Sequence, residues 1–141
     1  MLYGTYEHSI DKKGRVAIPV KLRAELGETF MVCRGIYGQS CLGIYSMDEW
    51  KKLEEKIEQL PSTKSIKLKR FLFGGSTPVE TDTQGRVLIP SNLREFAKLE
   101  GEALFIAVGS NLELWNPQLW ASEEAEYTPE NMAEISAGLE F

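Results

Sequence analysis

The sequence has few of the residues on which metal sites and nucleophilic catalysis depend. Its 141 residues include only two cysteines, Cys33 and Cys41, and one histidine, His8. These are too few ligands for a zinc site at the common spacings. No G-x-S-x-G, H-E-x-x-H or phosphate-binding loop motif occurs. We therefore expect no enzyme activity, no metal and no cofactor. We interpret both cysteines as buried, reduced thiols, with a redox pair as the alternative.

Long hydrophobic runs are also missing. No apolar stretch approaches the roughly 18 residues of a membrane helix, and the N-terminus MLYGTYEHSIDKK lacks the apolar core of a signal peptide. We expect a soluble, unexported, cytoplasmic protein without a membrane partner. Apolar residues make up 43% of the chain and charged residues 26%, which is the composition of a globular protein with a hydrophobic core.

Positive charge is absent from the last third of the chain. Residues 1–98 hold all 16 Lys and Arg beside 12 Asp and Glu, whereas residues 99–141 hold nine Glu and no base. The net charge of −5 therefore conceals a basic part and an acidic part, and local potential steers an anionic partner more than the total does. The basic run KSIKLKR is either a DNA-facing segment or, more simply, a solvated helix face; its bases are Lys64, Lys67, Lys69 and Arg70.

One nine-residue phrase occurs twice, as DKKGRVAIP at 11–19 and DTQGRVLIP at 82–90. Around each copy the pattern predicts a hairpin, a short helix, a strand pair and two further helices. A half of about 70 residues is marginal alone, and separate halves would expose apolar strand faces. We predict an α+β fold in which repeats 1–75 and 76–141 share one barrel-like sheet core with pseudo-two-fold symmetry, surrounded by helices.

Each phrase predicts two strands joined by a tight turn. Val16 alternates with Arg15, so the valine faces inward and the arginine outward. Asp11 is expected to accept hydrogen bonds from backbone amides of the turn, and Gly14 to take the positive φ that closes it. The second copy keeps these features in Asp82, Gly85, Arg86 and Val87.

The helices are predicted from their end signals. Short helices follow Pro19 and Pro90, each proline being placed as a first helical residue, and end near Gly27 and Gly101. A longer helix begins at Ser46 and ends before Pro61. Further helices are expected over roughly 63–72, from 116–117 onward and over roughly 129–138. The large aromatic residues are assigned to core packing, namely Tyr45, Trp50, Trp115 and Trp120.

An arginine just beyond a tight turn holds its planar guanidinium group in a defined position, with its donors in a fixed geometry. Arg15 and Arg86 could each make bidentate contacts with a phosphate or with guanine O6 and N7. Lys12 and Lys13 add charge at the first turn, whereas Thr83 and Gln84 make the second turn a hydrogen-bonding one. The alternative is that the Asp–Arg pairs are ion pairs that only fix the hairpins. Both roles are compatible, because one aspartate does not occupy all five guanidinium donors.

The motif D-x-x-G-R-V-x-I-P followed by x-x-L-R resembles the signature of the AbrB-like swapped-hairpin DNA-binding fold. It occurs at 11–23 and 82–94, and two tandem copies in a chain of this length resemble the MraZ family. The resemblance implies a bacterial transcription regulator, associated with the nucleoid, that forms a ring-shaped homo-oligomer. It implies binding to short direct repeats in double-stranded DNA upstream of the division and cell-wall gene cluster, including the protein's own gene. It implies DNA contacts by Arg15 and Arg86, with Asp11 and Asp82 as their motif partners.

Two other functions remain open from the residues alone. One is a protein-binding module of the antitoxin or scaffold type, whose hairpins meet an acidic protein. The other is an enzyme that uses Cys33 or Cys41 with His8, although no catalytic constellation is present. No small-molecule substrate is implied by the sequence.

Overall fold

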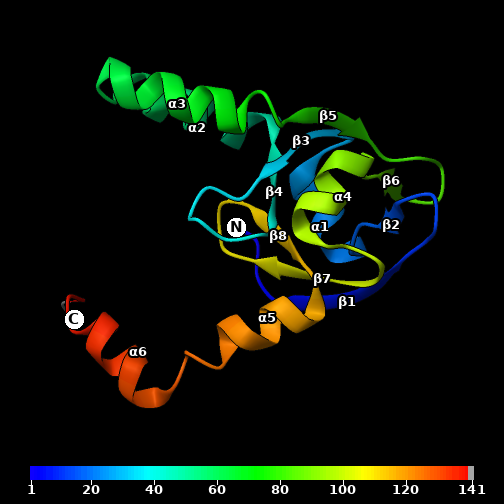
Figure 1. Cartoon of the computed structure of the whole chain (residues 1–141). Helices are drawn as coiled ribbons and strands as arrows, with labels where there is room; N and C mark the ends of the chain where they lie inside the picture. Colours follow the sequence, from blue (N-terminus) through cyan, green and yellow to red (C-terminus); the bar gives the residue numbers. More distant parts are fainter. Residues whose placement is uncertain (140–141) are drawn as a thin grey trace.

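Eight strands form one antiparallel sheet in the computed structural model, which describes residues 1–139. Their order is β5-β3-β4-β8-β7-β1-β2-β6, and the end strands β5 and β6 meet, so that the sheet is a nearly closed barrel (Figure 1). The strands are β1 (Thr5–Ile10), β2 (Arg15–Ala17), β3 (Thr29–Arg34), β4 (Leu42–Ser46), β5 (Thr77–Glu80), β6 (Arg86–Leu88), β7 (Gly101–Ala107) and β8 (Leu112–Trp115). The predicted α+β barrel is confirmed.

Residues 1–139 also form six helices, which lie outside the sheet. They are α1 (Val20–Leu26), α2 (Met47–Glu58), α3 (Ser62–Leu72), α4 (Ser91–Ala97), α5 (Pro117–Glu124) and α6 (Pro129–Ser136). In Figure 1, α1 and α4 lie against the barrel, α2 and α3 form a helical hairpin at one end, and α5 and α6 form an arm at the other. Within residues 1–139 no helix has both the length and the apolar character of a membrane span.

The two repeats exchange strands across a pseudo-two-fold axis. Strand β2 pairs with β6 about Val16 and Val87, and β4 pairs with β8 about Gly43 and Glu113. The remaining cross-repeat pairs, β1 with β7 and β3 with β5, are equivalent under the same symmetry. Each repeat therefore completes its sheet only with strands from the other.

The barrel interior is filled by the inward residues of both repeats. Phe30 and Phe105 are fully buried, as are Ile18 and Ile89, which precede the final proline of the two repeated phrases. The alternation along β2 buries Val16 and leaves Arg15 half-exposed. A side chain on the outer face of β2 or β6 is thus held by a strand whose other face is fixed in the core.

Helix ends agree with the sequence in part. Ser46 Oγ accepts a hydrogen bond from the Glu49 amide at 3.2 Å, so the predicted cap of α2 is confirmed. Pro19 and Pro90 are N-caps rather than first helical residues. The expected end of α4 near Gly101 is wrong: Lys98 takes the left-handed conformation at φ 54° and stops the helix after Ala97.

The two pairs of closing helices differ between repeats. Helices α2 and α3 enclose a cluster of apolar side chains that includes Trp50, Ile57 and Leu72. Helix α5 contacts the barrel through Trp120, which lies edge-on to Trp115 at 5.3 Å between ring centroids. Helix α6 ends at Ser136 rather than near 138, and Figure 1 shows it pointing away from the barrel.

Candidate nucleic-acid interface

The first turn is organised around the carboxylate of Asp11. Its Oδ1 accepts hydrogen bonds from the amides of Lys13 and Arg15, each at 2.9 Å. Its Oδ2 accepts from Arg15 Nε at 2.8 Å. The backbone closes the same loop, because the Gly14 amide donates to the Asp11 carbonyl at 2.9 Å. One aspartate thus fixes both the turn and the direction of the arginine.

The second turn repeats this geometry. Asp82 Oδ1 accepts from the amides of Gln84 at 2.8 Å and Arg86 at 2.9 Å, and Oδ2 accepts from Arg86 Nε at 3.0 Å. The Gly85 amide donates to the Asp82 carbonyl at 3.0 Å. The ion pair of the alternative interpretation is therefore present in both turns. It engages Nε of each arginine, and among the described residues the terminal guanidinium nitrogens make no hydrogen bond.

Hydrogen bonds to the ionised carboxylates determine their acidity. The Arg15 amide, together with the Arg15 side chain and the Lys13 amide, lowers the pKa of Asp11 below its ordinary value. The amides of Arg86 and Gln84, followed by the Arg86 side chain, lower the pKa of Asp82 in the same way. Both carboxylates are therefore charged at neutral pH and hold their arginines by charge-assisted bonds.

The two arginines share one face of the barrel. In the β2–β6 pair, Arg15 lies opposite Leu88 and Arg86 lies opposite Ala17, one step on either side of the central valines. Because those valines face the core, both arginines face outward. Their side chains are 36% and 31% exposed, which leaves guanidinium surface for a partner. Lys12, Lys13 and Gln84 are exposed on the adjoining turns.

Each turn is also supported by the opposite repeat. The Ile89 amide donates to the Gly14 carbonyl at 2.9 Å, and the Ile18 amide donates to the Gly85 carbonyl at 3.0 Å. Both glycines have positive φ, 92° for Gly14 and 74° for Gly85. A Cβ on Gly14 would lie 2.7 Å from Cζ of Arg94, and a Cβ on Gly85 would collide with the guanidinium of Arg23.

Arg23 and Arg94 are functional candidates that sequence reasoning left without a role. Their signal was their occurrence at the same place in both repeats, four residues after the proline. The structure shows that each lies behind the turn of the other repeat. They are not equivalent, because Arg23 Nε donates to the Ile18 carbonyl at 2.9 Å, whereas Arg94 Nε is buried without a hydrogen-bond partner among the described residues.

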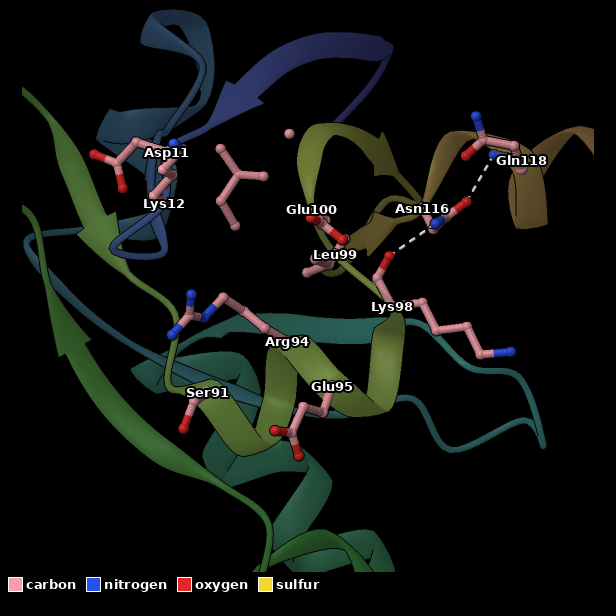
Figure 2. Close-up of a pocket in the computed structure, with 12 residues that line it drawn as sticks. Asp11, Lys12, Ser91, Arg94, Glu95, Lys98, Leu99, Glu100, Asn116 and Gln118 are labelled. Atoms are coloured by element: carbon pink, nitrogen blue, oxygen red, sulfur yellow. Dashed lines mark hydrogen bonds between the residues drawn. The ribbon is translucent and has the colours of Figure 1, made fainter.

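A hollow of about 1030 Å³ lies beside the first turn. Figure 2 shows Asp11 and Lys12 on one side of it and Arg94 and Lys98 of the α4 segment on the other. Its far rim is fixed by Asn116, whose Nδ2 donates to the Lys98 carbonyl at 2.7 Å (Figure 2). The first turn thus borders a space lined by three basic side chains and by the carboxylates of Asp11, Glu95 and Glu100.

The two cysteines lie away from the two turns, and their thiols have low reactivity. Both are free and buried, in the cluster beneath α2 and α3 for Cys33 and in the cluster near Trp115 for Cys41. Burial raises the pKa of each thiol to about 12, so the thiolate needed for nucleophilic attack is scarce at neutral pH. Within residues 1–139 no three His, Cys, Asp or Glu are grouped to hold a metal ion.

Comparison with known proteins identifies the family. The family model described as MraZ protein and antitoxin-like matches residues 1–68 and again residues 72–139. The chain belongs to the MraZ family. It is 46% identical to the transcriptional regulator MraZ of Caldanaerobacter subterraneus subsp. tengcongensis, over 99% of this chain and 97% of that protein. It is 44% identical to the same regulator of Natranaerobius thermophilus, over 95% of each chain.

Membership of the MraZ family accounts for the duplicated turn. The two matched regions are the two halves that pair across the pseudo-two-fold axis, as the resemblance implied. A third relative, the MraZ of Acetivibrio thermocellus, is 46% identical over 94% of this chain and 91% of its own length. These curated MraZ proteins are named as transcriptional regulators and not as enzymes.

Proposed function

We propose that this MraZ-family chain is a DNA-binding transcriptional regulator without enzyme activity, and that it contacts DNA through the outer face of β2 and β6. The observation that carries the proposal is the pair of outward arginines, Arg15 and Arg86, each held by an aspartate on the same face. A guanidinium fixed through Nε presents its terminal nitrogens for bidentate contact with guanine or phosphate. Relatives named as transcriptional regulators support the same function.

The flanking residues receive distinct roles in this proposal. Lys12 and Lys13 bind phosphates at the first turn, and Gln84 donates a hydrogen bond at the second. Asp11, Gly14, Asp82 and Gly85 orient the two turns. The division of the chain into repeats 1–75 and 76–141 is part of the same proposal; residues 140–141 lie outside the described residues.

We further propose the target and the assembly. The protein binds short direct repeats in double-stranded DNA upstream of the division and cell-wall gene cluster, including its own gene, and acts in the cytoplasm at the nucleoid. One chain offers few phosphate contacts, so a ring-shaped homo-oligomer that engages successive repeats gains affinity through effective concentration. The basic character of residues 1–98 favours a partner of high negative charge.

The test is binding to the upstream region of the protein's own gene, titrated against salt beside a scrambled duplex of equal length. We expect tight binding to the native duplex only, with log affinity falling by roughly 0.9 per log unit of salt for each phosphate neutralised. Arg15→Ala is expected to abolish this specific binding while leaving the assembly intact.

Two outcomes would contradict the proposal. Normal affinity of a correctly assembled Arg15→Ala variant would remove the first turn from the interface. Equal or absent binding to both duplexes by the wild-type protein would favour a protein-binding module, in line with the antitoxin-like description of the family model.

A further inference from the structure

Helix α6 carries an apolar stripe that its own chain leaves uncovered. Met132 and Ile135 are three residues apart, which places them on one side of α6. Leu139 follows Ile135 by four residues, just beyond the end of the helix at Ser136. Ile135 is 74% exposed and Leu139 62% exposed. None of the residues of α5 or α6 is fully buried, so this arm has an apolar face with no partner in its own fold.

The internal repeat shows what such a stripe does when it is covered. In α3 the residues at the equivalent spacing are Ser65, Leu68 and Leu72, and both stripes begin four residues after the helix N-cap. The α3 stripe packs against α2, whose side chains in the shared cluster are Trp50, Leu53 and Ile57. The stripe on α6 is therefore a helix-packing face that lacks the second helix.

Helix α5 does not supply that cover. It has eight residues where α2 has twelve, and its aromatic anchor Trp120 is turned toward the barrel at Trp115 and toward Tyr127. Figure 1 shows α6 directed away from the barrel, at the end of the molecule opposite to α2 and α3. The covering surface must come from another chain.

The charge of the arm indicates which surface of the other chain covers the apolar residues of α6. The arm from 117 to 139 contains no base and five glutamates, namely Glu123, Glu124, Glu126, Glu130 and Glu134. Pairing of two such arms would place like charges together. Helix α3 has the opposite character, with four bases and no acid along its length.

The outer side of α3 has the required chemistry. Ile66 is 44% exposed there, and Arg70 lies beside it, four residues further along the helix. Lys69 is engaged with Glu58, whereas Lys64, Lys67 and Arg70 have no ion pair among the described residues. An apolar contact at Ile66 thus lies beside the uncompensated charge of Arg70, on a helix with two further unpaired bases among the described residues.

We propose that the α6 stripe of one chain docks on the outer side of α3 of a second copy, through Ile135 and Ile66, with the glutamates of the arm facing the bases of α3. Each copy uses two different surfaces, so the contact is head-to-tail and generates a ring when the rotation closes. The inference rests on the self-association in the proposed function and names its interface. Attraction between exposed charges weakens with salt, so assembly is expected to weaken as well.

The test uses the full chain with Ile135→Asp or Ile66→Asp, measured by sedimentation velocity. Each variant is expected to raise the dissociation constant of self-association about tenfold or more and to keep the wild-type circular dichroism spectrum, since both side chains are exposed. Val20→Asp is the matched control, because Val20 is 75% exposed on α1 and is expected to leave assembly unchanged.

Mixing the two interface variants tests the head-to-tail geometry. Ile135→Asp retains an intact α3 surface and Ile66→Asp retains an intact α6 stripe. A mixture is therefore expected to form a one-to-one dimer and nothing larger. Assembly that survives either one of the two substitutions would overturn the proposal. A monomeric wild-type protein would overturn it as well.

The DNA titration separates this inference from the proposed function. If wild-type protein assembles through Ile135 and Ile66 but does not distinguish the native duplex, the interface stands and the DNA function fails. If the native duplex is bound specifically while both variants assemble normally, the function stands and the interface fails.

Discussion

At the scale of single residues, Gly85 is a position where both the backbone conformation and a neighbouring side chain disfavour any other residue. Its φ of 74° favours glycine, and a Cβ there would collide with the Arg23 guanidinium, which is held by the Ile18 carbonyl. Gly85→Ala is expected to lower the free energy of unfolding by about 2 kcal/mol or more, from the left-handed backbone and the displaced arginine together.

The matched control for Gly85 is Gly38→Ala. Gly38 also has a positive φ, 76°, but no atom lies within 4 Å of a Cβ there. The Gly38→Ala variant is expected to lose about 1 kcal/mol of the free energy of unfolding, because only the left-handed backbone conformation is penalised. Urea unfolding of both variants measures the difference, and equal losses would show that Arg23 moves away without cost.

The two arginines of the interface are expected to differ in their contribution. Arg15 lies with Lys12 and Lys13 on its turn, whereas Arg86 lies with Thr83 and Gln84. Arg86→Ala should therefore weaken DNA binding less than Arg15→Ala, and the salt dependence should change less. The same titration compares them, and a larger loss for Arg86 would reverse the ranking of the two turns.

At the scale of elements, the two turns make stability depend on pH. The amides of Arg15 and Arg86 lower the pKa values of Asp11 and Asp82 in the folded protein. Because the folded pKa values lie below the unfolded ones, this stabilisation is complete above about pH 4 and is lost as the pH falls through the folded values.

The thermal midpoint of the wild-type protein is therefore expected to decrease as the pH falls below about 4, in part because Asp11 and Asp82 become protonated. Asp11→Asn with Asp82→Asn should be less stable at pH 7 and should lose less on acidification below about pH 4. Calorimetric scans from pH 7 to pH 3 measure both effects. Parallel decline of the two proteins would show that the turns do not contribute.

Elements with explicit local chemistry were predictable from the sequence. The Asp, Gly and Arg of each phrase specified a hairpin turn, and Ser46 specified the start of α2. The end of α4 was not predictable, because a lysine, Lys98, takes a conformation that glycine normally marks. The supporting arginines Arg23 and Arg94 were visible as repeated residues, but only the exchange of strands places each behind the opposite turn.

At the scale of the whole molecule, each half holds strand pairs of its own but no continuous sheet. Strand β1 needs β7 for its long edge, β3 needs β5, and the two short strands β2 and β6 pair with each other. A chain of residues 1–75 is therefore expected not to fold as a monomer, and to regain dispersed amide signals when mixed with residues 76–141. A monomeric, dispersed spectrum of residues 1–75 alone would contradict this expectation.

The backbone contacts that the two repeats exchange at the turns also fix the distance between the two hairpin tips. The Gly14 carbonyl is fixed by Ile89 and the Gly85 carbonyl by Ile18, so neither hairpin tip can move without moving the strand that carries the other arginine. The barrel therefore holds the two hairpin tips, and the arginines beside them, at one fixed separation. For a DNA reader of this design, an inserted base pair between contacted sites cannot be absorbed within a chain. In the proposed assembly, tolerance of spacing would lie in the contacts between neighbouring copies, and those contacts can change without altering the residues that each turn presents to DNA.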